Sequence, residues 1–362
     1  MLHYQHINND IMFTVPYQCE KLYLIGTFTN WEKREAYKFS NTENWHMLRK
    51  NQDAFYKLGN SGYIEYCLWD DENQRTLPFN SNYPVGYYFN NQHNGNFNYL
   101  LLPENITPEE IAQIASDSKR SFHIKTSAEE FSSQYILANF REVTGGELAS
   151  GRLYRSYHPV VASRQNHAQL KEIETERQQV VMTLLEEHGI NTVINLSETD
   201  RELALALDSA QDSYYKTLWL KEQVVSVPMA YETVYFMSDR DESFNPDELG
   251  FQSGIRQVIQ YISQHQGPYH VHCRLGSDRT GVVIAFLQLM MGATKEQIRH
   301  NYLQTNNMAI GEFRSFRLLE QALTSALGID CFENSAETVR RYLSEIGVPQ
   351  DIIDTAYGKL AN

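Results

Sequence analysis

The stretch YHVHCRLGSDRTGVVIAF, residues 269–286, places Cys273 directly after a histidine and six residues before Arg279. Its pattern predicts a short strand, a loop of small and polar residues, and an apolar helix. A loop between a strand and a helix N-terminus is a natural anion site, because its free N–H groups point inward and the helix dipole adds positive potential. Gly276 permits a tight turn and a close approach to a ligand, and Gly281 lets the helix pack near the sheet.

Cys273 adds a candidate nucleophile to this loop. Loop N–H groups favour a thiolate over a thiol, so we expect Cys273 to be nucleophilic at neutral pH. Arg279 can hold two phosphate oxygens bidentately, and Thr280 can donate a hydrogen bond to the leaving sulfur. Together these groups predict attack on phosphorus through a phosphocysteine intermediate, with no metal or cofactor. His272 is expected to orient the loop and not to act as a base. The residues expected to contact the substrate are Arg274, Leu275, Gly276, Ser277, Asp278, Arg279 and Thr280.

The composition of the 362 residues, 42% hydrophobic and 21% charged, is that of a globular protein. The net charge of −14 argues against nucleic acid or an anionic membrane as the main partner. No apolar run is long enough to predict a membrane span, and the N-terminus carries no export signal. The cysteines at 19, 67, 273 and 331 match no zinc or redox-pair spacing, which predicts reduced thiols and a cytoplasmic location.

The types of residue and their periodicity divide the chain into three parts. Short aromatic and β-branched segments predict an all-β, immunoglobulin-like sandwich over residues 1–103, ending in a hairpin around Asn94-Gly95. A capping box from Thr107 to Glu110 starts a predicted linker helix within 104–120. Over residues 121–362, strands and helices alternate, which predicts an α/β domain whose central, mainly parallel sheet is flanked by helices, with two final helices.

The loop HCRLGSDRTG resembles the signature loop of cysteine-dependent protein tyrosine and dual-specificity phosphatases. The similarity extends over roughly residues 120–350, in the order seen in the bacterial tyrosine phosphatase family whose members include lipid-phosphate-active enzymes. The segments that carry it are NFREVTGG and GRLYRS (139–156), HGINTVINLSETDREL (188–203), VVSVPM (224–229) and RTGVVIAFLQLMMGATKEQIRHNYLQTN (279–306). That family's loop usually reads HCxxGKDRTG. Asp278 matches it, but Ser277 replaces the lysine, which weakens an expected preference for highly phosphorylated inositides.

An acid must protonate the leaving oxygen. Many phosphatases of this kind use an aspartate about 30 residues before the cysteine, where the candidates are Asp239, Asp241 and Asp247. Others use the aspartate inside the loop, here Asp278. We expect Asp278 first and Asp241 or Asp239 second, since Asp247 looks like a first-turn helix residue. Arg155 is expected to support the sheet edge, with contact to the substrate as the alternative.

The segment KLYLIGTFTNWEKREAYKF (21–39) resembles the start of glycogen-binding modules of the starch-binding class, with matches at Gly26, Phe28, Asn30 and Trp31. The resemblance implies that Trp31 stacks on sugar rings. A second tryptophan platform is missing or has moved to Trp69. The same sandwich often serves as a structural module, so both roles stay open.

The substrate is open within the enzyme hypothesis. Phosphotyrosine is the default, and phosphoinositides, inositol phosphates and phosphorylated glucans are alternatives. A phosphate-binding module without turnover is a second class, although such proteins usually lose the cysteine or the arginine. Redox chemistry between Cys273 and Cys331 is a third.

Overall fold

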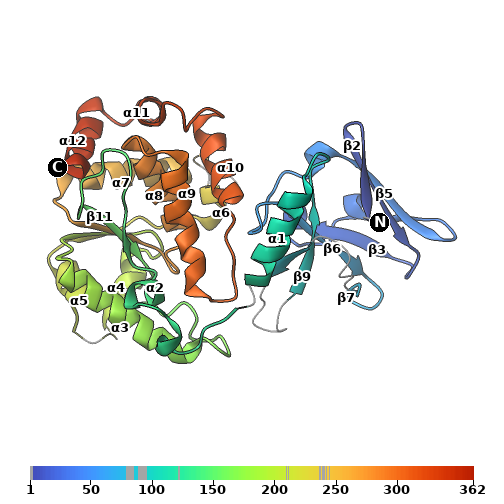
Figure 1. Cartoon of the computed structure of the whole chain (residues 1–362), viewed down its shortest axis with the longest axis horizontal. Helices are drawn as coiled ribbons and strands as arrows, with labels where there is room; N and C mark the ends of the chain where they lie inside the picture. Colours follow the sequence, from blue (N-terminus) through green and yellow to red (C-terminus); the bar gives the residue numbers. More distant parts are fainter. Residues whose placement is uncertain are drawn as a thin grey trace. The chain divides into compact units, whose positions relative to one another are not determined.

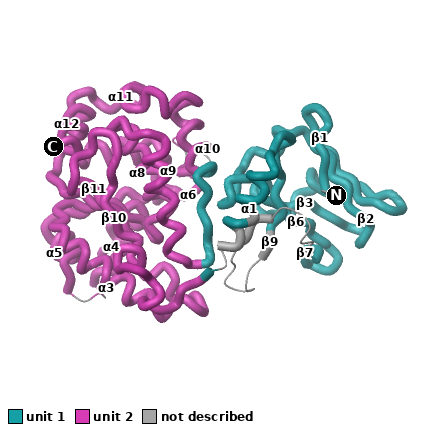
Figure 2. The backbone as a smooth tube through the Cα atoms, viewed as in Figure 1, with its two compact units in different colours: residues 1–123, 311–318 teal, residues 124–310, 319–362 magenta. Residues whose placement is uncertain are grey.

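The chain forms two compact units, which Figure 2 colours separately. Unit 1 comprises residues 1–123 and 311–318, and unit 2 comprises residues 124–310 and 319–362. The computed structural model describes residues 3–78, 85–88, 96–120, 123–208, 210, 212–235, 238, 241, 243 and 245–362. Residues 311–318, which we expected in the phosphatase domain, group with unit 1, as does the predicted linker helix.

Unit 1 contains two antiparallel sheets. The first has the order β1-β2-β5-β4, with strands at Tyr4–Ile7, Asp10–Pro16, Trp45–Asn51 and Ser40–Asn41. The second has the order β3-β6-β9-β8, with strands at Leu22–Gly26, Ile64–Asp70, Asn96–Leu101 and Val85–Tyr88, and β7 (Arg75–Thr76) pairs with β6. Alternation along β2 buries Ile11, Phe13 and Val15 in the core of this unit. The predicted turn at Asn94-Gly95 lies outside the described residues.

Helix α1 (Pro108–Arg120) begins where its capping signal predicts. The Glu110 N–H donates to Thr107 Oγ1 at 3.2 Å, and the Thr107 N–H donates to Glu110 Oε2 at 2.9 Å. These reciprocal bonds satisfy two N–H groups that the first helical turn leaves without partners, which confirms the predicted capping box.

Unit 2 is built on a sheet of order β10-β11-β14-β12-β13. Its strands are Arg141–Glu142, Leu153–Ser156, Tyr269–His272, Thr192–Asn195 and Val224–Ser226. β11, β14, β12 and β13 run parallel, whereas β10 is antiparallel to β11. Every residue of β11, β14 and β12 is buried, as expected for strands covered on both faces.

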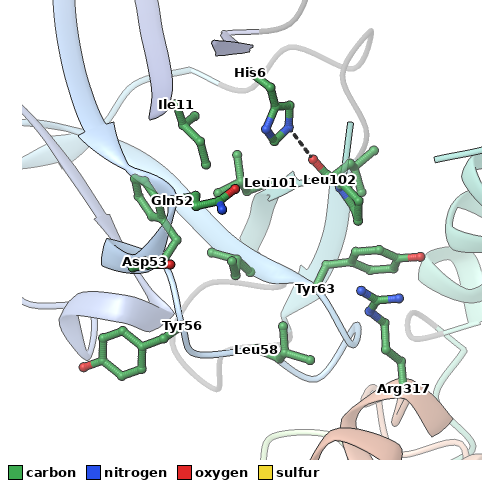
Figure 3. A pocket seen from close by; sticks show the side chains of 13 residues that line it. His6, Ile11, Gln52, Asp53, Tyr56, Leu58, Tyr63, Leu101, Leu102 and Arg317 are labelled. Carbon is green, nitrogen blue, oxygen red and sulfur yellow. Dashed lines mark hydrogen bonds between the residues drawn. The ribbon is translucent and has the colours of Figure 1, made fainter. Parts of the chain in front are cut away.

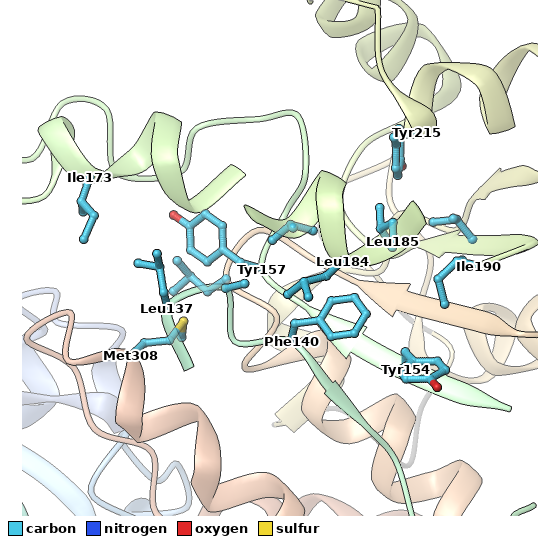
Figure 4. Packing of buried hydrophobic residues seen from close by; sticks show 14 of the residues in the cluster. Leu137, Phe140, Tyr154, Tyr157, Ile173, Leu184, Leu185, Ile190, Tyr215 and Met308 are labelled. Carbon is cyan, nitrogen blue, oxygen red and sulfur yellow. The ribbon is translucent and has the colours of Figure 1, made fainter. Parts of the chain in front are cut away.

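Helices cover both faces of this sheet, with α3, α4 and α5 on one side and α7 and α8 on the other (Figure 1). The helices are α2 (Gln134–Leu137), α3 (Lys171–Glu187), α4 (Asp200–Asp208), α5 (Tyr214–Leu220), α6 (Tyr231–Tyr235), α7 (Phe251–Gln264), α8 (Arg279–Met290), α9 (Lys295–Leu303), α10 (Phe316–Leu327), α11 (Ser335–Glu345) and α12 (Gln350–Ala361). Figure 4 shows part of the core on the α3 side, where Tyr154, Leu184 and Tyr215 belong to one buried cluster.

The end of the chain differs from the prediction of two final helices. A third helix, α12, follows Pro349, and it buries Ile353, Ala356 and Leu360 along one face. These three residues are spaced by three and four positions, as on one face of a helix.

Candidate active site

The loop from Cys273 to Asp278 connects the central strand to a fully buried helix. β14 ends at His272 and α8 begins at Arg279, as the sequence pattern predicts. Because neighbours on both sides fix β14, the strand end has one position from which the loop can leave. Cys273 is the first loop residue, and its side chain is 3% exposed.

The carbonyl groups of the loop are turned into the protein. The Asn139 Nδ2 group donates to Leu275 O at 3.0 Å and to Gly276 O at 3.3 Å. Arg155 Nη2 donates to Gly276 O at 2.5 Å. Gly276 has a φ of +69°, and a Cβ there would lie 2.0 Å from Ser156 O, so only glycine fits this turn.

Five backbone N–H groups of this segment point away from these inward contacts. Among the described residues, none accepts a hydrogen bond from the backbone N–H of residues 274, 275, 276, 277 or 279. A run of such donors at a helix N-terminus is a concave anion-binding surface.

One terminal nitrogen of Arg279 is hydrogen-bonded to the protein. Its Nη1 donates to Leu196 O at 3.2 Å and to Met229 O at 3.3 Å. Within the described part of the chain, Nε and Nη2 have no partner. The carbonyls therefore orient the guanidinium and leave one edge for oxygens of an anion.

Arg155 lies buried among the groups of this loop. Burial lowers the pKa of Arg155 to about 10, although the Cys273, Tyr302, Tyr235 and Asp278 side chains oppose the shift. Arg155 therefore stays charged at neutral pH and contributes a fixed positive charge beside Cys273. We expected this residue to have a structural role, and its hydrogen bond to Gly276 gives that role a specific form.

Asp278 is 7% exposed and accepts a hydrogen bond from a buried tyrosine. Tyr235 OH donates to Asp278 Oδ1 at 3.2 Å and also lies 2.6 Å from Tyr302 OH. Burial, together with the charges of Tyr302 and Asp278, raises the pKa of Tyr235 well above its usual value, so this hydroxyl remains a donor. Tyr302 packs so closely on α8 that a Cβ on Gly281 would lie 2.7 Å from its ring.

Ser277 faces inward and not toward the anion site. Its side chain is 2% exposed, and Oγ lies 2.6 Å from Thr305 Oγ1. The serine therefore packs inside the protein, and its expected effect on inositide preference stays a prediction.

The buried histidines before the loop are neutral. Burial lowers the pKa of His272 well below its usual value and that of His270 to about 3. His272 Nε2 lies 3.0 Å from Tyr215 OH, and His270 Nε2 lies 2.8 Å from Ser156 Oγ. These contacts fit an orienting role for His272. Thr280 Oγ1, in contrast, is buried without a hydrogen-bond partner among the described residues.

Glu198, which the sequence analysis did not single out, lies beside the loop. Its side chain is 2% exposed and pairs with both His158 Nε2, at 2.8 Å, and Arg274 Nε. Burial raises the pKa of Glu198, but the charges of His158, Arg274 and Arg279 outweigh burial and lower it. No local sequence motif predicts this residue, because it meets the loop only when β12 and β14 pair in the sheet.

The three other acid candidates lie away from the loop or outside the described residues. The Asp241 carboxylate accepts from Ser253 N and Ser253 Oγ, each at 2.7 Å, and from Arg256 Nη2 at 2.9 Å. Burial raises the pKa of Asp241, but these partners outweigh it and hold the pKa below its usual value. Asp247 is exposed and precedes α7, so its expected place in the first helical turn is wrong. Asp239 lies outside the described residues.

Glu248 is a carboxyl group beside Arg279 that sequence reasoning also missed. Leu249 N donates to Pro228 O at 2.7 Å, and Ala230 N donates to Leu249 O at 3.0 Å. These bonds pair Leu249, the residue after Glu248, with Met229, whose carbonyl holds Arg279. Burial raises the pKa of Glu248, the charge of Arg279 opposes this rise, and Glu232 and Glu202 add to it.

Unit 1 carries the predicted sugar contact on its surface. Trp31 is 41% exposed and has a φ of +62°, an unusual backbone conformation for a bulky residue. Trp69 instead packs against the buried cluster of Tyr23, Ile25 and Cys67. A cavity of about 510 Å³ also opens in this unit, lined by Gln52, Tyr63 and Arg317 among others (Figure 3).

The described residues contain no group of three or more histidine, cysteine or acidic side chains placed to hold a metal ion. They also contain no helix of the length and apolarity needed to cross a membrane.

Comparison with known proteins assigns the family. The model of the tyrosine phosphatase family matches residues 136–361, more than half of the chain and including the loop at 273–279. No curated protein matches the sequence. Among solved structures, the chain resembles the core catalytic domain of the PP-IP phosphatase SIW14 from S. cerevisiae in complex with citrate, at 16% identity and a TM-score of 0.30, over 57% of this chain and 94% of that one. On the family match, this chain belongs to the tyrosine phosphatase family.

Proposed function

We propose that the protein is a phosphomonoester hydrolase, most plainly a protein tyrosine phosphatase, that works through a phosphocysteine at Cys273. The observation that carries the proposal is the run of loop N–H groups without acceptors directly after the buried cysteine. A phosphoryl group supplies acceptors for such donors, and charge developing on its oxygens is stabilised by groups that are already oriented. Arg279 adds the free edge of a guanidinium whose other edge the protein holds.

The reaction proceeds in two displacements on phosphorus. The Cys273 thiolate attacks, the S–P bond forms, the ester P–O bond breaks, and an acid protonates the leaving oxygen. Water then attacks phosphorus and gives a proton to the conjugate base, the S–P bond breaks, and inorganic phosphate leaves. The unpartnered Thr280 hydroxyl donates a hydrogen bond to the departing sulfur. No cofactor takes part.

Asp278 is the acid that the contacts favour. It belongs to the loop that carries Cys273, and Tyr235 OH donates to its Oδ1, which orients the carboxyl group. Asp241 is the weaker candidate, because three hydrogen bonds tie its carboxylate to α7 and favour its charged form. An acid must hold a proton before the step, and that environment opposes protonation.

Hydrolysis of a generic aryl phosphate tests the mechanism. Cys273→Ser is expected to abolish turnover while retaining the thermal unfolding of the parent. Cys331→Ser, at another buried cysteine of unit 2, is expected to retain turnover, whereas a dithiol redox mechanism requires its loss. Normal turnover by Cys273→Ser contradicts the mechanism. Phosphate binding by the parent without any turnover identifies the alternative, a binding module.

A panel of phosphorylated substrates tests which substrate class the protein prefers. We propose phosphotyrosine peptides as the first class, with phosphoinositides, inositol phosphates and phosphoglucans as the alternatives. Comparing kcat/KM across these four classes identifies the preferred one. A preference of ten-fold or more for any other class overturns the tyrosine assignment.

We further propose that unit 1 is an immunoglobulin-like, glycogen-binding-type module that contacts glycan through Trp31. The exposed indole supports this, as does the neighbouring Asn30, whose Oδ1 accepts from Lys57 Nζ at 2.7 Å and so stabilises the turn. A glycan pull-down with Trp31→Ala as its control tests the proposal. No binding by the parent refutes it and leaves a structural role.

A further inference from the structure

The side chain of Arg274 has an anchored inner part and an unoccupied outer edge. Its Nε forms an ion pair with Glu198 Oε1, yet the arginine side chain is 45% exposed. Among the described residues, no acceptor pairs with Nη1 or Nη2. A guanidinium carries five N–H donors in a planar fork, so four donors remain for a ligand.

The inner part of Arg274 and its partner Glu198 are held by several contacts. The N–H groups of Val160 and Val161 donate to His158 Nδ1 at 3.0 and 2.9 Å, so Nε2 carries the proton and donates to Glu198 Oε2. The backbone of Arg274 is held as well, because its carbonyl accepts from His158 N at 3.3 Å and from Ser163 Oγ at 3.1 Å. Little conformational entropy therefore remains to be lost when the outer edge binds a ligand.

Arg274 and Arg279 both act on this carboxylate, but only Arg274 forms an ion pair with it. Arg279 bonds to Leu196 O, two residues before Glu198, and its charge acts on Glu198 together with that of Arg274. Both guanidinium groups are therefore oriented at the carboxyl end of β12. The single negative charge of Glu198 does not balance the two positive charges of Arg274 and Arg279, so the excess positive charge favours an anionic ligand. Arg279 is assigned to the phosphoryl group, so Arg274 is available to a second anion.

We infer that Arg274 forms a second anion subsite beside the phosphate site and selects substrates that carry another phosphate or carboxylate near the scissile phosphate. This inference rests on the proposed phosphatase function. The ligand class follows from the donors, because a planar fork with two free terminal nitrogens matches the two oxygens of either anion. Ser277 does not contribute, since its side chain packs against Thr305.

Matched small substrates test the subsite. Carboxyphenyl phosphates with the carboxylate in the ortho, meta or para position are compared with their carbamoyl isosteres, which are neutral. At one position or more, the parent is expected to show a kcat/KM ratio of carboxylate to amide of about ten or more, mainly through KM. In Arg274→Gln the ratio is expected to fall to near one. Phenylene bisphosphates against hydroxyphenyl phosphates then separate a phosphate preference from a carboxylate preference.

Controls separate the subsite from folding and from the proposed function. Arg299→Gln removes an exposed arginine on α9 and is expected to keep the ratio of the parent. Arg274→Gln removes one of the two partners of Glu198 and leaves it with His158, so the double variant with Glu198→Gln repeats the measurement without that buried carboxylate. A ratio near one in the parent at every position, or a high ratio that persists in Arg274→Gln, overturns the subsite. If the parent hydrolyses none of these esters, the phosphatase function fails and the subsite with it.

Discussion

The guanidinium of Arg155 donates a hydrogen bond to the carbonyl oxygen of Gly276 over 2.5 Å, at a fully buried position. Its other terminal nitrogen donates to Asn301 Oδ1 at 3.0 Å. The cation therefore ties the tightest turn of the loop to α9. Holding the Gly276 carbonyl inward is also what leaves the neighbouring N–H groups for an anion.

Replacing Arg155 is expected to damage both stability and turnover. Arg155→Met removes two buried hydrogen bonds, to Gly276 O and to Asn301 Oδ1, and is expected to lower the free energy of unfolding by about 3 kcal/mol. It also removes the positive charge beside Cys273, so kcat/KM falls by more than the folded fraction accounts for. Urea denaturation and aryl phosphate hydrolysis measure the two effects. Unchanged unfolding, matching an exposed control such as Arg299→Met, contradicts the structural role.

Asp278→Asn is expected to slow substrates with poor leaving groups far more than substrates with good ones. An acid contributes most where the leaving oxygen is basic, and general acid catalysis is worth roughly 10²–10⁴-fold. The comparison uses phenyl phosphate against a nitrophenyl phosphate. Asp241→Asn should show no such dependence and should instead destabilise α7. The opposite pattern in the two variants would assign the acid to Asp241.

Glu248→Gln is expected to change how anion affinity depends on pH. The carboxyl group lies near Arg279 and its pKa is raised, first by burial, so it gains a proton as the pH falls and stops competing with the anion. Sulfate keeps its charge over the relevant range, and the Cys273→Ser background removes the thiol from the titration. Sulfate affinity should rise toward low pH with Glu248 present and stay nearly flat with glutamine. Parallel pH profiles in the two proteins would exclude Glu248.

Ser277→Lys is expected to destabilise the protein without favouring polyphosphorylated inositides. The side chain position is buried against Thr305, and a lysine there must either lose its charge or push the loop aside. Ser277→Ala loses one hydrogen bond, at a cost of about 1 kcal/mol. Thermal unfolding ranks the three proteins. A stable lysine variant with a gain in inositide turnover would show that this side chain reaches the substrate.

Stability is expected to fall below about pH 6.5 because of the neutral histidines. Burial lowers the pKa of His270 from 6.5 to about 3. The unfolded chain therefore takes up a proton near pH 6.5 that the folded chain refuses, and stability present above that pH is lost between it and pH 3. At pH 5 the loss is about 2 kcal/mol for such a histidine. Urea denaturation at pH 7.5 and 5 should show a smaller difference for His270→Gln than for the exposed control His300→Gln.

The parts of the site that sequence predicts are those that lie within one short segment. Cys273 and Arg279 are linked by a six-residue spacing that any strand–loop–helix context preserves, so local pattern suffices. The inward turn of Ser277 depends on Thr305, which belongs to a different element. Nothing in the loop sequence distinguishes an inward serine from an outward one.

Residues that reach the site through the fold could not be found in this way. Glu198 follows β12, and its meeting with Arg274 depends on β12 and β14 being neighbours in the sheet. Asp241 looked like an acid because of its distance from Cys273 in sequence. Its bonds to Ser253 and Arg256 arise only when the loop folds back on α7. Distance along the chain does not indicate which carboxylate is already hydrogen-bonded to other parts of the protein.

The assignment of residues 311–318 to unit 1 has a practical consequence for dissecting this protein. The chain passes from one unit to the other three times, so no single cut releases unit 2 as one continuous piece with all its residues. A fragment starting at residue 124 would carry a stretch whose natural neighbours are missing. Replacing unit 1 by another domain, through recombination or engineering, would therefore also require a matching replacement of residues 311–318, which lie within the sequence of unit 2.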